Sequence, residues 1–145
     1  MEVSFDYFLE KFEEVNTFGK TNGHQYEVIK AGEVITKMKI LDIHQNSPGI
    51  AHGGSLAGMM DAVLGVAALS STVLDGNLVS TVEFKINYFK PIYLNDELVG
   101  KGKVIRKGKS LVVSIGEIYR GEEMVAHGQG TFNVYPIAKR AGANK

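Results

Sequence analysis

Residues 54–71, GSLAGMMDAVLGVAALSS, form the feature that most constrains how this chain can fold. The segment is longer than an ordinary strand and would be apolar on almost every side of a helix. A helix without a polar face must be buried on most sides, so the rest of the chain has to wrap around it. Asp61 is its one formally charged side chain, and the fold has to accommodate that carboxylate.

The segments after the apolar helix predict the strands that do the wrapping. Apolar and polar residues alternate along them, and the short joints at 107–109 and 121–122 are typical of antiparallel hairpins. The predicted strands are Leu78–Tyr88, Glu97–Arg106, Leu111–Arg120 and Met124–Tyr135.

The residues before the apolar helix add two strands and one helix. Residues 26–30 and 34–43 predict strands, and residues 3–15 carry the three-to-four apolar spacing of an amphipathic helix. We therefore expect one α+β domain over residues 1–145, with an antiparallel sheet of five or six strands around the central helix. An extra helix within residues 1–20 and a loose tail at 137–145 complete the expected architecture.

The composition removes several classes of partner and site. Sixteen Lys and Arg residues balance sixteen Asp and Glu residues, which takes away the electrostatic reason to expect nucleic acid or an anionic membrane as the main partner. Cysteine is absent, so a thiol nucleophile, disulfides and zinc–thiolate sites are excluded. The four histidines are scattered and do not predict a metal site.

The N-terminal residues do not predict export. The stretch MEVSFDYFLEKFEEVN is acidic where a secretory signal is basic, and it lacks a long apolar core. Asp61 interrupts the best apolar run, which is then shorter than the roughly 18–20 residues of a membrane span. We expect a cytoplasmic protein that needs no metal and no cofactor.

Two short motifs resemble known functional loops. Residues 53–57, GGSLA, nearly match the G-x-S-x-G nucleophile elbow. That elbow needs a strand leading into the turn, and residues 46–52 do not predict one, so Ser55 is not expected to be a nucleophile. Residues 102–110 resemble a phosphate-binding loop, but five residues separate the glycines where the loop requires four. We expect a hairpin turn there.

The start of the apolar helix and Asp61 carry two groups that hydrolysis of an acyl group can use. If the helix begins at Gly53 or Gly54, its first N–H groups lack intrahelical partners and can donate to a developing oxyanion. Asp61 lies eight residues after Gly53, about 12 Å along the axis. A water-activating carboxylate must lie roughly 3 Å from its water, so one helix cannot present both groups to one carbonyl. A second, antiparallel copy of the helix can present the missing group to the same carbonyl. The spacing therefore predicts a two-fold homodimer.

Two structural explanations of Asp61 compete with this one. Asp61 could cap a helix that begins at Ala62, although Leu64 at the third helical position gives no capping box. Alternatively, Asp61 is a buried carboxylate satisfied by local hydrogen bonds. The residues alone leave the functional and the structural explanations open.

The chain resembles the hotdog-fold acyl-CoA thioesterases of the phenylacetic-acid-pathway type and of the thioesterase superfamily member 2 type. The residues that carry the resemblance are Asn46, His52-Gly53-Gly54, Asp61 and the segment Val79–Pro91, VSTVEFKINYFKP. They match the spacing N-x5-H-G-G-x6-D without a gap, and the resemblance covers about residues 25–135. It implies a hotdog fold, hydrolysis of an acyl-coenzyme A, and a homodimer that pairs into a dimer of dimers.

The resemblance also implies roles for individual residues. Asp61 would activate the hydrolytic water or attack the thioester, and the Gly53 N–H would polarise the carbonyl, with Asn46 beside them. His52, Gly54 and Thr81 would surround the substrate. Three lysines are candidates for the nucleotide phosphates, although Lys at hairpin ends is also typical of solvated sheet edges; they are Lys90, Lys107 and Lys109.

Two other functions stay open. A hydratase or dehydratase of acyl thioesters would share the fold, but its usual spacings are not those of His52 and Asp61. A non-catalytic acyl-thioester-binding module is the second alternative, and a lone buried charge would not favour pure binding.

Overall fold

The structure, a computed structural model, describes residues 4–142. Its helices are α1 (Phe5–Val15), α2 (Thr17–Thr21), α3 (Gly53–Thr72) and α4 (Ile137–Gly142), with 3-10 turns at Asp42–His44 and Val73–Asp75. Its strands are β1 (Gln25–Lys30), β2 (Glu33–Lys39), β3 (Gln45–Ser47), β4 (Ile50–Ala51), β5 (Asn77–Tyr88), β6 (Glu97–Lys107), β7 (Leu111–Arg120) and β8 (Glu123–Pro136). Val3, at the start of the predicted N-terminal helix, lies outside the described residues.

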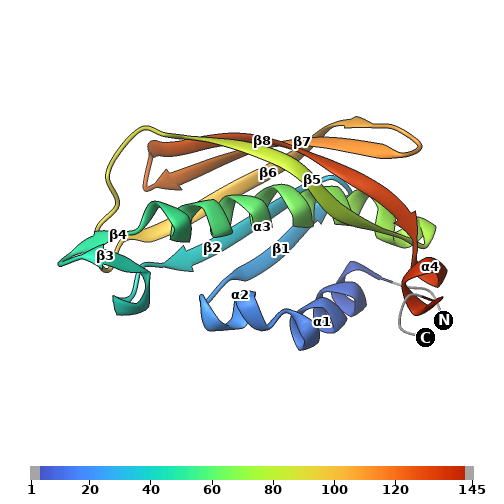
Figure 1. Ribbon diagram of the computed structural model, residues 1–145, viewed down its shortest axis with the longest axis horizontal. Coiled ribbons are helices and arrows are strands. Elements are labelled where there is room, and N and C mark those ends of the chain that lie inside the picture. The colour runs from blue at the N-terminus through green and yellow to red at the C-terminus, as the bar shows by residue number, and fades with distance from the viewer. Residues whose placement is uncertain (1–3, 143–145) are drawn as a thin grey trace.

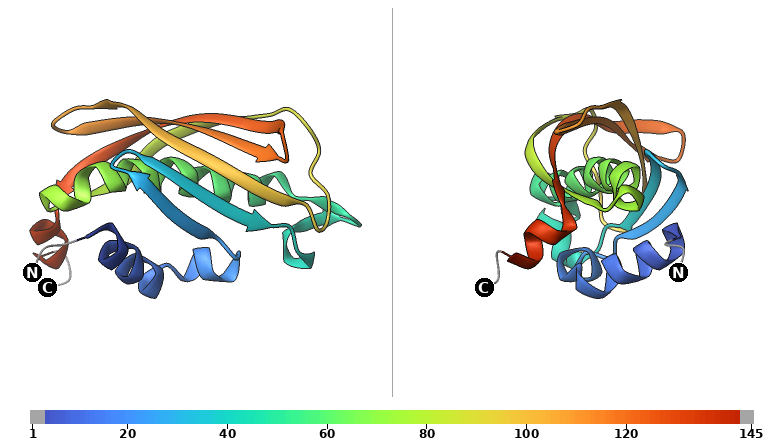
Figure 2. Two further views of the ribbon diagram at one scale, coloured as in Figure 1. Left: turned by 180° about the vertical axis from the view of Figure 1, so that it is seen from behind. Right: turned by 90° about the vertical axis from the view of Figure 1, so that its right-hand side faces the viewer.

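A six-stranded antiparallel sheet in the order β1-β2-β6-β7-β8-β5 curls around α3 (Figure 1). Figure 2 shows α3 end-on inside the curve, with α1 and α2 on the side that the sheet leaves open. Strands β3 and β4 form a separate two-stranded hairpin near the start of α3. The predicted α+β architecture and the expected hotdog fold are confirmed.

Glycines on the concave face of the sheet let α3 approach closely. A Cβ atom at Gly102 would lie 2.3 Å from the Val63 carbonyl oxygen, and one at Gly116 would lie 2.6 Å from the Met60 sulfur. Side chains at these positions would push the helix off the sheet. The close approach explains the glycines in the middle of β6, β7 and β8, where a strand would otherwise favour larger residues.

The sheet covers most of the circumference of α3, so the helix is the core of the molecule. Met59, Met60 and Val63 are fully buried. By length and composition Gly53–Asp75 is the one helical stretch within residues 4–142 that could cross a membrane, but it lies here inside the sheet. The less covered face of α3 carries mainly small residues and one carboxylate: Gly58, Asp61, Ala62 and Gly65.

The second strand ends earlier than predicted. We expected a strand over residues 34–43, but β2 stops at Lys39. After Lys39 the backbone bonds to the turn that precedes β6, where the Ile40 N–H donates to the Asp96 carbonyl at 2.9 Å. The Leu41 N–H donates to His44 Nδ1 at 2.8 Å, which bends the next residues into a 3-10 turn.

Three short elements were missed or misread. The tail predicted over 137–145 begins as α4, which contains the good helix formers Ala, Lys and Arg, while residues 143–145 lie outside the described part. Helix α2 was not predicted because it is only five residues long and starts at a side-chain cap, with Asn16 accepting from the Gly19 N–H. The β3–β4 hairpin is too short to show periodicity.

Candidate functional site

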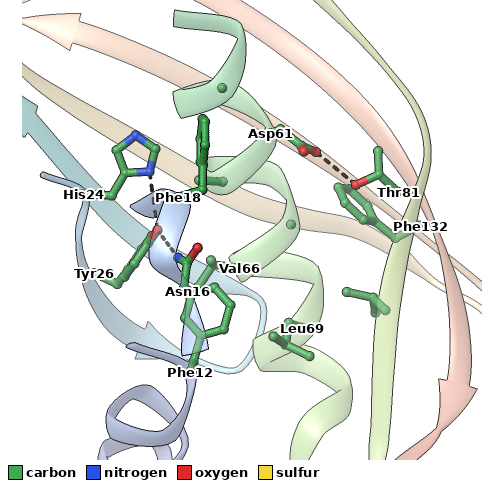
Figure 3. A pocket seen from close by; sticks show the side chains of 14 residues that line it. Phe12, Asn16, Phe18, His24, Tyr26, Asp61, Val66, Leu69, Thr81 and Phe132 are labelled. Atoms are coloured by element: carbon green, nitrogen blue, oxygen red, sulfur yellow. Dashed lines mark hydrogen bonds between the residues drawn. The ribbon is translucent and has the colours of Figure 1, made fainter. Parts of the chain in front are cut away.

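Asp61 and Thr81 form a hydrogen-bonded pair between the core helix and an edge strand. The Thr81 hydroxyl on β5 donates to Asp61 Oδ1 at 2.9 Å (Figure 3). Since α3 runs unbroken from Gly53 to Thr72, Asp61 is in mid-helix, and the alternative that it caps a helix at Ala62 is wrong. The carboxylate is half-buried, so it is not the fully buried charge that the sequence suggested.

A β-bulge in β5 sets the position of Thr81. Thr81 lies opposite Phe132 of β8, but Glu83 lies opposite the adjacent Thr131, so Val82 is an extra residue. A bulge of this kind bends the strand and redirects its side chains. Val82 is left 59% exposed, and Thr81 reaches the helix.

The N-terminus of α3 is held by two side chains. His52 is the N-cap, and its Nδ1 accepts from the Gly54 N–H at 2.7 Å. The Tyr88 hydroxyl, from the end of β5, donates to the Gly53 carbonyl at 2.7 Å. Within residues 4–142 no group accepts from the Gly53 N–H. This arrangement leaves one backbone donor free at the positive end of the helix dipole.

Gly54 has a steric reason to be glycine. A Cβ atom there would lie 2.8 Å from His52 Nδ1, inside the capping hydrogen bond. At Gly53 a Cβ atom would make ordinary contact with the Tyr88 ring, at 3.5 Å. The two glycines therefore differ. A side chain at Gly53 would make only ordinary contacts, whereas a side chain at Gly54 would disrupt the cap.

Asn46 lies on β3, beside the start of α3 and exposed. Its Oδ1 accepts from the Ser47 hydroxyl at 3.2 Å. The neighbouring His44 carbonyl accepts from the His52 N–H at 2.6 Å and from the Ser55 hydroxyl at 3.2 Å, which ties the segment to the helix.

Ser55 is held within this connection. Its hydroxyl is the donor to His44 and is bound to the backbone rather than to a base. The prediction that no strand precedes the turn is wrong in detail, because β4 covers Ile50–Ala51. That two-residue strand belongs to the small hairpin and not to the main sheet, so the nucleophile elbow is still not formed.

The structure separates the three lysines. Lys90 lines a cavity of about 330 Å³ together with Gly53 and Tyr88, at the start of α3. Lys107 lies at the other end, where its ammonium donates to the Ser71 carbonyl at 2.6 Å and to Asp75 at 2.8 Å. Lys109 is exposed in the β6–β7 hairpin turn, which is the turn predicted for residues 102–110. Within one chain only Lys90 lies beside Gly53.

Asp61 and Thr81 line a cavity of about 430 Å³ that the N-terminal segment helps to enclose (Figure 3). The wall from α3 and the sheet is apolar apart from this pair, and it includes Val66, Leu69, Val79 and Phe132. The opposite wall comes from α1, α2, β1 and the residues that join them, and it consists of Phe12, Asn16, Phe18, His24 and Tyr26. Sequence reasoning did not connect these five residues with the site.

Two of the histidines that predict no metal site are packed inside the molecule. His24 and His44 are buried, at 8% and 1% exposure. Burial, and then the nearby His44, lowers the pKa of His24 from its ordinary 6.5 to about 4; burial also lowers the pKa of His44. The alternation of β1 could have indicated that His24 is buried, because His24, Tyr26 and Val28 are alternate residues and face inward together.

No metal site was found in the described part of the chain. Within residues 4–142, no group of three His, Asp or Glu side chains is arranged to hold an ion. The chain instead offers a carboxylate paired with a hydroxyl in the middle of α3 and, separately at the start of that helix, a free backbone N–H. Such groups can activate water and stabilise an oxyanion.

Comparisons with known proteins point to one family. The family model described as "Thioesterase superfamily" matches residues 48–127. Human acyl-coenzyme A thioesterase 13 is 32% identical over 80 residues, which are 55% of this chain and 56% of that protein. The chain spans 56–59% of the length of the first curated relatives it matches.

Solved structures agree with this result. A hypothetical thioesterase from Streptococcus pneumoniae, solved with coenzyme A, is 27% identical with a TM-score of 0.70, covering 78% of this chain and 89% of that one. The PaaI protein of the phenylacetic acid degradation operon of Escherichia coli has a TM-score of 0.76 at 21% identity, covering 86% of this chain and 88% of that one. At that identity the second likeness concerns the fold alone.

Proposed function

This chain belongs to the thioesterase superfamily, and on that premise we propose that it hydrolyses an acyl-coenzyme A to a free acid and coenzyme A. A relative named acyl-coenzyme A thioesterase and a related structure with coenzyme A support the choice of substrate. A thioester carbonyl is a good electrophile, so a carboxylate, a water molecule and an oxyanion donor suffice for its hydrolysis.

Asp61 is the general base of the proposed reaction. Its carboxylate takes a proton from water as the water oxygen attacks the carbonyl carbon. The Thr81 hydroxyl holds Oδ1 of that carboxylate in place. Collapse of the tetrahedral intermediate breaks the C–S bond, and the coenzyme A thiolate leaves and takes up a proton. Direct attack by Asp61, followed by hydrolysis of the mixed anhydride, gives the same products.

The Gly53 N–H is the oxyanion donor. It lies at the positive end of the α3 dipole, which favours the negative charge that develops on the carbonyl oxygen. His52, Gly54 and Asn46 support this end of the helix. Lys90, in the adjacent cavity, is the best placed of the three lysines to meet a phosphate of coenzyme A.

Each site is shared between two chains. Gly53 and Asp61 lie eight residues apart on one straight helix, about 12 Å along its axis, so one carbonyl must take its two partners from different protomers. The open edge of the sheet supports this assembly. Strand β5 is a terminal strand of the sheet and is 12 residues long. It leaves Val82 and Tyr88 59% and 49% exposed, and such an edge invites pairing with another copy.

The observation that carries the proposal is the Asp61–Thr81 pair, the polar feature of an otherwise apolar cavity wall. The test is thiol release from acetyl-, hexanoyl-, decanoyl- and phenylacetyl-coenzyme A. We expect turnover of at least one of them, and a loss of roughly 100-fold or more in Asp61→Asn, with circular dichroism unchanged. Asp75→Asn, in the 3-10 turn that follows α3, is the matched control and keeps its activity.

Other outcomes would identify the rivals. Binding of acyl-coenzyme A without thiol release would identify a binding module. Hydration of an unsaturated acyl-coenzyme A without thiol release would identify a hydratase. Wild-type turnover in Asp61→Asn would exclude Asp61 as the base.

A further inference from the structure

A chain of hydrogen bonds runs through the N-terminal wall of the Asp61 cavity (Figure 3). The Gly19 N–H donates to Asn16 Oδ1 at 3.1 Å, as the cap of α2. Asn16 Nδ2 in turn lies 2.9 Å from the Tyr26 hydroxyl oxygen. The Tyr26 hydroxyl lies 3.4 Å from His24 Nδ1. Four residues from α2, its cap, β1 and the position just before β1 are thus linked in series.

The direction of this chain favours one neutral tautomer of His24, the one with its proton on Nε2. Because Asn16 Oδ1 accepts from a backbone N–H, its Nδ2 must be the donor to Tyr26. The Tyr26 oxygen accepts that bond, so its own proton is free to go to His24 Nδ1. A neutral imidazole that accepts at Nδ1 carries its proton on Nε2. Burial keeps His24 neutral, since its pKa is lowered to about 4.

The Nε2–H of His24 is then a donor without an acceptor. The side chain is 8% exposed, and no group within the described residues bonds to Nε2. In Figure 3 this nitrogen lies on the ring edge away from Tyr26. A buried, unpaired N–H costs free energy and is usually found where a ligand or water completes it.

Phe18 covers this part of the cavity. Its ring centre lies 5.8 Å from that of His24 in an edge-to-face arrangement, and its Cζ lies 2.8 Å from where a Cβ atom of Gly58 would be. Gly58 is one turn before Asp61 on α3. Phe18 itself is 59% exposed, and a substrate would have to displace this ring to reach His24.

We propose that the His24 Nε2–H binds an oxygen acceptor on the acyl group of the substrate. The cavity would then select acyl groups with an apolar body and a keto or hydroxyl oxygen away from the thioester. This inference rests on the proposed function, because it places the acyl group in the cavity that Asp61 lines. The apolar body would pack on Val66, Leu69 and Val79, and the oxygen would satisfy the free donor.

The first test measures the donor directly on the wild-type protein. Nitrogen-15 NMR of the histidine side chains separates the two neutral tautomers and the cation. We expect the His24 signals at pH 7 to be those of the Nε2–H tautomer, with Tyr26→Phe moving them toward a mixture of tautomers. A proton on Nδ1, or a charged ring, would overturn the inference without any measurement of activity.

The second test measures selectivity. Thiol release is compared for hexanoyl-coenzyme A and its keto analogues with the oxygen on the third, fourth or fifth carbon. We expect kcat/KM of one keto analogue to exceed that of hexanoyl-coenzyme A by roughly tenfold or more, as for pockets built to bond a polar group. In His24→Phe this ratio falls to about one, whereas His127→Phe, on β8 and outside the cavity lining, keeps it.

The outcomes separate this inference from the proposed function. Thiol release from none of these substrates, and from none of the acyl-coenzyme A species named under the proposed function, would overturn the proposed function. Release without preference for any keto analogue, or a preference that survives in His24→Phe, would overturn only the role of His24.

Discussion

The Thr81 hydroxyl donates to Asp61 Oδ1 at 2.9 Å and so joins the edge strand of the sheet to the middle of its core helix. The bulge that follows Thr81 bends β5 so that this contact forms. The same strand ends at Tyr88, whose hydroxyl donates to the Gly53 carbonyl at the start of α3. One strand therefore holds both parts of the proposed machinery, the carboxylate and the oxyanion donor.

Thr81→Val should lower kcat about tenfold and change KM little. Valine keeps the shape of threonine but removes the hydroxyl, so Asp61 loses the donor that orients it, a bond to a charged group worth about 1.5–3 kcal/mol. Thr81→Ser should retain most of the activity because it keeps the hydroxyl. Ser80→Ala, the neighbouring residue on β5, is the control. Equal kcat values in Thr81→Val and the wild type would show that the contact has no part in catalysis.

Ser55→Ala should leave hydrolysis nearly unchanged and lower the free energy of unfolding by about 1 kcal/mol, the usual contribution of one hydrogen bond. The Ser55 hydroxyl donates to the His44 carbonyl and is not activated by a base. Steady-state kinetics and urea unfolding measure the two effects. A loss of activity of 100-fold or more with an intact fold would instead identify Ser55 as a nucleophile.

Tyr88→Phe should lower kcat several-fold, since the ring stays against Gly53 while the hydroxyl that fixes its carbonyl is lost. The oxyanion donor would then be less well oriented. Tyr93→Phe is the matched control, because Tyr93 is similarly exposed, at 45% against 49%. If the two variants had equal kcat values, the Tyr88 hydroxyl would have no role in positioning the helix start.

The stability of the protein should fall as the pH is lowered from about 6.5 toward about 4. His24 is neutral in the fold because its pKa is lowered to about 4, whereas the unfolded chain takes up a proton near 6.5. The unfolded state binds more protons than the folded state in this window. The stability that neutral His24 contributes is therefore complete above pH 6.5 and is lost as the pH falls toward 4. The slope for one such group is at most about 1.4 kcal/mol per pH unit.

Urea unfolding between pH 4 and pH 7 measures this slope. His44, whose pKa burial also lowers, acts in the same direction, so His24→Phe should reduce the slope without abolishing it. A stability that is constant over this range, or that rises on acidification, would show that His24 is not buried in its neutral form.

The sequence predicted the framework well because the framework depends on periodicity. The helix expected over residues 54–71 extends from Gly53 to Thr72, and all four strands after it lie within two residues of their predicted ends. Local hydrogen bonds overrode the pattern elsewhere, as at His44, whose ring accepts from Leu41 and ends the extended segment early.

The site was only partly predictable. The family resemblance named Asp61 and Thr81, but nothing local in the sequence pairs residues 20 positions apart, and the bulge at Val82 that brings them together has no sequence signature of its own. His24 could not be placed in the cavity because its position depends on how β1 packs across the open side of α3. The homodimer, its pairing into a dimer of dimers and the cytoplasmic location stay predictions.

The shared site is the central claim, and mixed dimers test it most directly. Gly53→Val removes the open approach to the oxyanion donor, and Asp61→Asn removes the base, so each homodimer should be nearly inactive. Mixed dimers of the two variants, verified by native mass spectrometry, would contain one site with both groups intact and should recover up to about half of the wild-type rate, by the symmetry of a two-fold interface. Mixed dimers no more active than their parents would contradict a site built from two chains.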